Sequence, residues 1–109
     1  MEKNKHAEAL VYALNVLKQD RFKKYIKAIY LYGSCARGDQ MIQSDVDLFI
    51  KVKGDTPQKI LLSMRKEVIS GDLSLPEVEL KFSRNDSFSS SEQFNQNIER
   101  EGKLLWQRM

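Results

Sequence analysis

Two aspartates separated by one residue form the part of the sequence best suited to chemistry. Asp45 and Asp47 flank Val46. If this segment is a strand, both side chains leave the same face, with Cβ atoms about 7 Å apart. At an effective dielectric constant of about 20, two carboxylates at that separation repel each other by about 2 kcal/mol. A divalent cation offsets this repulsion, and Mg²⁺ suits one or two carboxylates together with water and substrate phosphates. Taken alone, however, the pair is more typical of a solvated strand edge.

A Gly-Ser pair precedes the aspartates and ends an apolar run. Gly33 and Ser34 follow the β-branched and aromatic segment 26–32. Glycine has no Cβ, so a phosphate can approach its backbone, and Ser34 opens a turn whose N–H groups and hydroxyl can hold that phosphate. Arg37 lies three residues after Ser34, where its guanidinium can reach a terminal phosphate; a surface arginine paired with Asp39 is the alternative. The sequence thus places a candidate phosphate site beside a candidate metal site.

The two features together form a more specific pattern, because ten residues separate Ser34 from Asp45. The combined pattern Gly-Ser-x10-Asp-x-Asp resembles the signature of the minimal nucleotidyltransferases of the DNA polymerase β superfamily. The residues that carry this resemblance are Gly33-Ser34, Ala36-Arg37-Gly38 and Ser44-Asp45-Val46-Asp47-Leu48. The ending Ile98-x-x-Glu-Gly-x-Leu-Leu-Trp106 is also similar to the C-terminal segment of that family. The resemblance implies one minimal nucleotidyltransferase domain over residues 1–109.

The resemblance assigns roles to individual residues. It implies that the nucleotide phosphates are bound by Gly33, Ser34, Arg37 and Ser44. It also implies that two Mg²⁺ ions are held by Asp45, Asp47 and a third carboxylate on the next strand, for which Glu79 is the best match. The family more often has aspartate there, and glutamate carries its oxygens about one methylene further. Glu77 lies on the same face and competes for this role, and a solvated Glu-x-Glu-x-Lys strand face is the alternative.

The resemblance also implies an activity and a partner. AMP would pass from ATP to a hydroxyl acceptor, with Glu79, or Asp45 in its absence, taking the acceptor proton. Minimal nucleotidyltransferases are commonly paired with a HEPN-domain protein as antitoxin to toxin, so a tyrosine of that partner is the expected acceptor. Two alternatives stay open: an antitoxin that acts by contact alone, with a weak or inactive site, and nucleotidyl transfer to a small molecule or RNA.

The surrounding sequence indicates the elements that position these residues. Helices are expected over residues 5–19, from Thr56-Pro57 to Gly71 and over 90–101; strands are expected over 26–32, 46–52 and 77–82. The first helix presents Ala7, Leu10, Val11, Leu14 and Leu17 on one face, and Thr56 caps the second. Leu104, Leu105 and Trp106 should dock on the core. The order predicts a small α/β (α+β) fold with a mixed sheet of three or more strands covered by helices.

Composition excludes several classes of protein. The 109 residues are 41% hydrophobic and 30% charged, which is typical of a single soluble globular domain. One cysteine and one histidine exclude a disulfide framework and ordinary Cys/His zinc sites, and leave Cys35 without a base. No apolar run suggests a membrane span or signal, so we expect a cytoplasmic protein without a membrane partner.

The charge of the chain does not decide whether it has further partners, such as RNA or an acidic protein. The net charge of +3 is too small to identify a nucleic-acid binder. Five cations nevertheless stand against Asp20 alone in one short segment, namely Lys18, Arg21, Lys23, Lys24 and Lys27. A solvated helix end is the favoured interpretation, and docking of RNA or of an acidic protein surface is the alternative. A homo-oligomer is compatible with the sequence.

Overall fold

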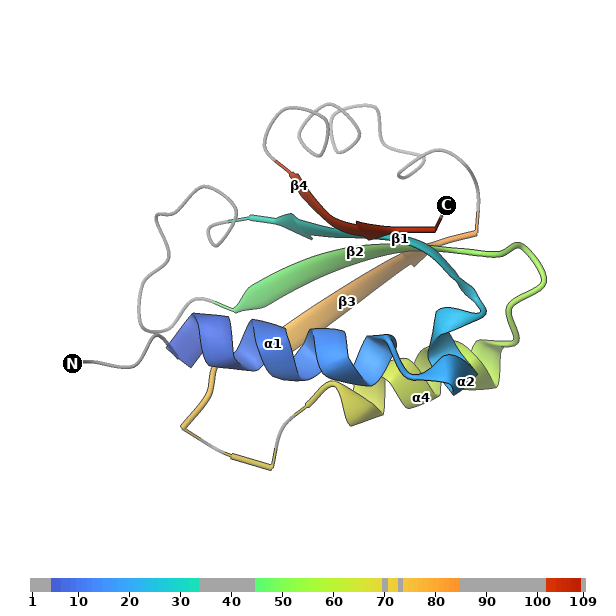
Figure 1. Ribbon diagram of the computed structural model, residues 1–109. Coiled ribbons are helices and arrows are strands. Elements are labelled where there is room, and N and C mark those ends of the chain that lie inside the picture. The colour runs from blue at the N-terminus through green and yellow to red at the C-terminus, as the bar shows by residue number, and fades with distance from the viewer. Residues whose placement is uncertain (1–4, 34–44, 70, 73, 85–101, 109) are drawn as a thin grey trace.

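Four strands form one mixed sheet in the computed structural model, which describes residues 5–33, 45–69, 71–72, 74–84 and 102–108 (Figure 1). The described elements are α1 (Lys5–Leu17), α2 (Asp20–Lys23), β1 (Ile26–Tyr32), β2 (Val46–Val52), α4 (Gln58–Glu67), β3 (Val78–Ser83) and β4 (Lys103–Gln107). The strand order is β3-β2-β1-β4. β1 runs antiparallel to both β2 and β4, whereas β2 and β3 are parallel. The predicted α+β class with a mixed sheet and helices is confirmed.

The core lies between the sheet and the two longer helices. Figure 1 shows α1 and α4 on the same face of the sheet, and α1 contacts β2, β3 and α4. Alternate residues of β2 face these helices and are at most 1% exposed: Val46, Leu48, Ile50 and Val52. Leu61 and Met64 of α4 complete this layer and are also buried. Apolar burial on this face therefore fixes which side chains of the sheet point to the opposite face.

The opposite face of β2 carries Asp47, Phe49 and Lys51, as the alternation predicts. Asp47 and Lys51 are partly exposed, and Phe49 is 2% exposed. In the antiparallel register, Tyr30 of β1 is the partner of Phe49, so the tyrosine shares its face. Polar and ionisable groups of the sheet are thereby collected away from the helices.

The first helix differs from its prediction in length and in the face it buries. It ends at Leu17 rather than at residue 19, and the chain turns into α2, which the sequence analysis did not identify. The residues of α1 that are buried are Ala9, Ala13, Val16 and Leu17. Leu10 and Leu14 pack only at the margin of the core, and Val11 is 55% exposed. Small alanine side chains let the helix backbone approach the sheet, so the contact stripe is rotated from the one that the larger residues suggested.

The second long helix begins and ends inside the predicted limits. Thr56 does not cap it: its hydroxyl donates a hydrogen bond to the Lys53 carbonyl at 2.6 Å and closes the preceding turn. Pro57 occupies the cap position with extended backbone, rather than the first helical position. The helix stops at Glu67, with Val68 as its C-terminal cap, before Gly71 is reached. Thr56 is 3% exposed, so its hydroxyl was committed to a buried turn rather than to the helix N-terminus.

The C-terminal segment is a strand. The prediction that Leu104, Leu105 and Trp106 return to the core is confirmed for Leu105 and Trp106, which pack against it, while Leu104 is 49% exposed. They lie in β4, which pairs with β1 and adds a fourth strand to the three that were predicted. The helix predicted over 90–101 lies outside the described residues. Within the described part of the chain, no helix has the length and apolar character needed to cross a membrane.

Candidate active site

A row of three side chains crosses the sheet on the face opposite the helices. Asp47 of β2 is the register partner of Glu79 on β3 and of Tyr32 on β1. Asp45 directly precedes β2, and Gly33 directly follows β1. The parallel pairing of β2 and β3 starts next to this row, where the Val46 N–H donates to the Glu77 carbonyl at 2.8 Å. We call Tyr32, Asp47 and Glu79, together with Asp45, the carboxylate row.

The charges of the carboxylate row act on Asp47. Burial raises the pKa of Asp47 above its usual value, and the charges of Glu79 and then Asp45 raise it further. A hydrogen bond with the Glu79 side chain acts in the same direction, while the positive charge of Lys81 opposes it. The Asp47 carboxylate is therefore held beside other negative charge, and a cation next to it would relieve the repulsion.

Tyr32 is the non-carboxylate member of the row. Burial, and then the charges of Asp47 and Glu79, raise the pKa of its phenol to about 12. The phenol is therefore neutral at physiological pH and keeps its O–H as a hydrogen-bond donor. Sequence reasoning assigned no role to Tyr32 or Lys81, although alternation placed Lys81 on the face of Glu79. The nearness of both residues to Asp47 depends on the strand registers, which residue patterns within single strands do not contain.

Gly33 has a structural role that its sequence position did not reveal. Its φ of +76° lies in the left-handed region of backbone conformation, which residues with a side chain rarely adopt. A Cβ at this position would also lie 2.6 Å from Oδ2 of Asp47. The absence of a side chain therefore gives the Asp47 carboxylate its space, in addition to the phosphate approach expected from the sequence.

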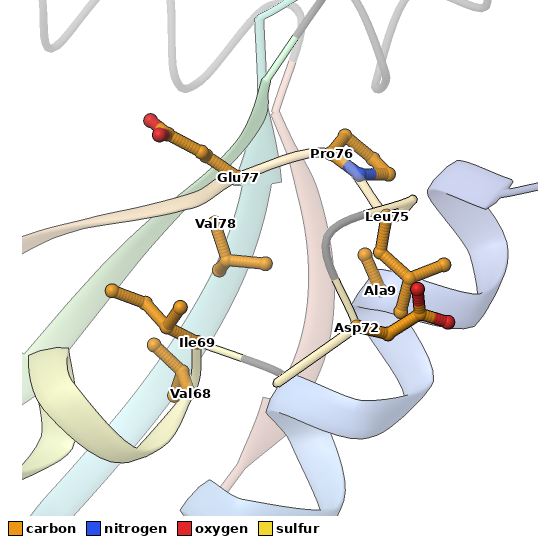
Figure 2. Close-up of a pocket in the computed structure, with 8 residues that line it drawn as sticks. All are labelled: Ala9, Val68, Ile69, Asp72, Leu75, Pro76, Glu77 and Val78. Atoms are coloured by element: carbon orange, nitrogen blue, oxygen red, sulfur yellow. The ribbon is translucent and has the colours of Figure 1, made fainter.

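The other predicted site residues fall into two groups. Ser34, Arg37 and Ser44 lie outside the described residues. Glu77, the competing third carboxylate, precedes β3, whereas Glu79 lies within β3 and is the residue paired with Asp47; both glutamates are exposed. Figure 2 shows the Glu77 carboxylate directed away from the apolar residues around it. The strand register thus favours Glu79 over Glu77 as the neighbour of Asp47.

A pocket lies elsewhere, on the helix side of the sheet (Figure 2). Ala9 of α1, Val68 and Ile69 after α4, and Val78 of β3 form much of its lining. Its polar groups belong to Asp72 and Glu77. Val78 faces the helices whereas Glu79, the next residue, faces the other side of the sheet. The pocket is therefore separate from the carboxylate row.

The donor chemistry of the carboxylate row fits magnesium. Asp47 and Glu79 offer hard oxygen ligands on adjacent strands, and because the Glu79 charge raises the Asp47 pKa, a cation beside them would be favourable. As the side chains stand, no group of three His, Cys, Asp or Glu within the described ranges is arranged to hold a metal ion. The carboxylate row therefore presents Asp47 and Glu79 as a pair, with Asp45 as its third carboxylate.

Comparisons with known proteins agree on the fold. A toxin–antitoxin crystal structure with AMP-PNP is 22% identical over 98% of this chain and 76% of the matched chain, with a TM-score of 0.63. The crystal structure of a toxin–antitoxin MntA-HpeT mutant is 20% identical over 98% of this chain and 76% of the matched chain, with a TM-score of 0.61. The crystal structure of a putative nucleotidyltransferase from Sulfolobus solfataricus is 18% identical over 98% of this chain and 91% of the matched chain, with a TM-score of 0.50.

Sequence comparison identifies the family. No curated protein sequence is significantly similar to this chain. The family model described as "Polymerase beta, Nucleotidyltransferase" matches residues 15–109, which include both the Gly-Ser pair and all three carboxylates. The carboxylate row and the sheet that builds it therefore belong to a member of the polymerase β nucleotidyltransferase family.

Proposed function

We propose that this chain is a magnesium-dependent nucleotidyltransferase that transfers AMP from ATP to a tyrosine hydroxyl of a HEPN-domain toxin, to which it is the antitoxin. The observation that carries the proposal is the pairing of Asp47 with Glu79 across two parallel strands, beside the turn at Gly33. Family membership supplies the reaction class, because two-metal nucleotidyl transfer needs carboxylates beside a phosphate-binding turn.

The structural neighbours support a nucleotide substrate and a toxin partner. One of them is a toxin–antitoxin complex with AMP-PNP, an ATP analogue. Another is a toxin–antitoxin mutant in which two aspartates two positions apart are replaced by glutamate, the spacing that Asp45 and Asp47 have here. The HEPN character of the partner and the tyrosine acceptor come from the family resemblance.

Each residue of the site has a role in this proposal. Magnesium ions held by Asp45, Asp47 and Glu79 would lower the pKa of the acceptor hydroxyl and neutralise charge on the leaving pyrophosphate. Glu79, or Asp45 in its absence, takes the proton of the acceptor hydroxyl. The acceptor oxygen then forms a bond to the α-phosphorus, and the bond from that phosphorus to pyrophosphate breaks. Gly33, Ser34, Arg37 and Ser44 bind the phosphates.

The experiment is magnesium-dependent release of pyrophosphate from ATP in the presence of the partner. Release that requires all three components supports the proposal. Partner binding without any release identifies the second candidate, an antitoxin that acts by contact alone. That candidate is favoured by one observation, the lack of a three-ligand metal arrangement among the described residues.

A binding measurement separates the phosphate site from the carboxylate row. Arg37→Ala should weaken ATP binding about ten- to a hundredfold, because it loses a charge-assisted contact of about 1.5–3 kcal/mol to the outer phosphates. AMP, which lacks those phosphates, should bind both proteins alike. Calorimetric titration checks this, and equal ATP affinity of the two proteins would make Arg37 an ordinary surface residue.

A further inference from the structure

Positive charge collects at the end of the sheet opposite the carboxylate row. β2 begins at Val46, between Asp45 and Asp47, and ends at Val52, directly before Lys53. Around that far end lie five cations from four different segments, which we call the basic end: Lys23, Lys24, Lys27, Lys53 and Arg108. Four of them are exposed, and Lys27 is partly exposed. In Figure 1, α2, the start of β1 and the end of β4 lie on the same side of the molecule, at the right of the view.

Backbone and side-chain hydrogen bonds hold the basic end together. The Arg108 N–H donates to the Lys27 carbonyl at 2.8 Å, and its guanidinium donates to the Ile26 carbonyl at 3.2 Å and to the Lys23 carbonyl. The Lys53 N–H donates to the Tyr25 carbonyl at 2.9 Å. Segments distant in the sequence thus present their cations on one surface.

The charge of Arg108 is not cancelled by these bonds, because its partners are carbonyl oxygens rather than carboxylates. Arg21, the next cation on α2, is different: it is paired with Glu67 and is left out of the basic end. Among the residues that the structure describes, the acidic ones in the adjoining turns are Asp20 and Asp55, both exposed. Even with Lys27 left out of the count, the four exposed cations of the basic end outnumber these two acidic residues and leave a local positive excess.

Two aromatic rings stand among the cations. The Lys23 ammonium lies 6.0 Å from the centre of the Trp106 ring, and the Lys24 ammonium lies 5.3 Å from that of Tyr25. Both rings pack against the core on one side and are partly exposed, so each keeps some ring surface open to solvent. An acidic protein surface would use the charges but not the rings. Unpaired bases use both, because they stack on aromatic side chains while their phosphates contact lysine and arginine.

We propose that the basic end binds single-stranded nucleic acid, with phosphates on the lysines and Arg108 and with a base against Trp106 or Tyr25. Asp47 and Lys53 are six residues apart on one extended segment, which corresponds to about 20 Å. The basic end is therefore a docking surface separate from the reaction centre. The inference stands on the charges and rings of this end and does not depend on the proposed transfer activity.

The chain offers a direct probe, because Trp106 is its only tryptophan. A single-stranded oligouridylate titrated into the full chain should quench the tryptophan fluorescence in a saturable way. The logarithm of the affinity should fall with the logarithm of the salt concentration with a slope of about −3, as expected when about four phosphates are neutralised. Lys24→Glu/Lys53→Glu should weaken binding about tenfold or more at low salt.

A matched variant controls for total charge. Lys5→Glu/Lys103→Glu makes the same change in net charge at the opposite end of the molecule, since Lys103 is the register partner of Leu31 near the end of β1. It should keep affinity within about twofold of wild type. The neutral pair Lys24→Gln/Lys53→Gln, with the fold of each variant checked by circular dichroism, should also bind more weakly than wild type.

Three results would overturn the proposal. The first is no saturable binding of the oligonucleotide at low salt. The second is an equal loss of affinity in the two charge-reversed pairs, which would reduce the effect to net charge. The third is that polyglutamate binds as tightly as the oligouridylate, whether or not it changes the tryptophan fluorescence. That result would assign the surface to an acidic protein.

Discussion

At the scale of single residues, Asp47 is placed where its charge is unfavourable. Burial, Glu79 and Asp45 all raise its pKa, so the folded chain binds a proton more readily than the unfolded chain between the unfolded and folded pKa values. Stability contributed by this group therefore falls as the pH rises through that window and is recovered as the pH falls. An ionised Asp47 is tolerated at neutral pH at the expense of stability, as is typical of functional groups.

The first prediction follows from this loss of stability when Asp47 ionises. Asp47→Asn keeps the shape and can still donate a hydrogen bond to Glu79, but it cannot ionise. In the absence of divalent cations, it should be more stable than wild type at pH 7 by about 1 kcal/mol, a value reduced for the solvent screening of a partly exposed group. The difference should shrink as the pH falls towards the usual aspartate pKa of about 4. Urea unfolding of both proteins at several pH values measures it, with Asp55→Asn as an exposed control. A variant less stable than wild type at pH 7 would contradict the argument.

The second prediction concerns the space beside Asp47. Gly33→Ala introduces a Cβ at a positive φ and places it 2.6 Å from Asp47 Oδ2. It should destabilise the protein by about 2 kcal/mol or more, from backbone strain and the clash together. In an Asp47→Ala background the clash is absent and only the strain remains. A double-mutant cycle should therefore give a coupling of at least about 0.5 kcal/mol; additive effects would show that the two residues do not share this space.

At the scale of elements, local pattern predicted the strands better than the helix faces. Alternation in 46–52 was sufficient to place Asp47 and the core residues on opposite faces, because a strand has a period of two wherever it lies. The face of α1 was predicted only in part: Leu17 is buried as expected, but the stripe is rotated towards Ala9 and Ala13, whose close packing depends on the sheet beneath them. Thr56 was wrong as a cap because its turn is buried.

In the candidate site too, patterns within one strand were predictable and contacts between strands were not. Spacing within one strand indicated that Asp45 and Asp47 act together, and alternation placed Glu77 and Glu79 on one face. Choosing between those two glutamates requires the parallel register of β2 and β3. Placing Tyr32 beside Asp47 requires the antiparallel register of β1 and β2. Registers depend on contacts between distant segments, so they are not contained in local residue patterns.

The third prediction concerns β4, whose pairing with β1 is also a distant contact. Ending the chain after Gly102 removes β4, exposes the edge of β1 and deletes the tether from Arg108 to Ile26. The loss should be about 2–3 kcal/mol, or about 10–20 °C in Tm, with increased self-association through the open edge. Thermal unfolding and size-exclusion chromatography measure both effects. Removing only residues 108–109 keeps β4 and should have a smaller effect; equal loss from the two truncations would show that strand pairing contributes nothing.

At the scale of the whole molecule, charge is separated along the sheet. The carboxylate row lies where β2 and β3 begin, and the basic end lies where β2 and β4 finish. A nucleotide with its magnesium ions and a polyanionic strand would therefore occupy different ends of one small domain. Distance weakens the interaction between them, because about 20 Å exceeds the screening length of about 8 Å at physiological ionic strength.

The fourth prediction tests this separation. An oligouridylate bound at the basic end should remain bound when Mg²⁺ and ATP are added to saturation, provided that ionic strength is held constant. Trp106 fluorescence reports the bound fraction directly. Displacement by ATP with a competitive concentration dependence would place both ligands on one surface and contradict the assignment of two ends.

The most direct test of the central claim is the intact mass of the partner toxin after incubation with this chain, ATP and Mg²⁺. Wild type should add the mass of one AMP, or a multiple of it, to the partner. Asp47→Asn should add none while still forming the complex, and Asp55→Asn, which changes an exposed aspartate away from the carboxylate row, should act as wild type. An unmodified partner with wild type, or full modification by Asp47→Asn, would contradict the assignment of nucleotidyl transfer to the carboxylate row.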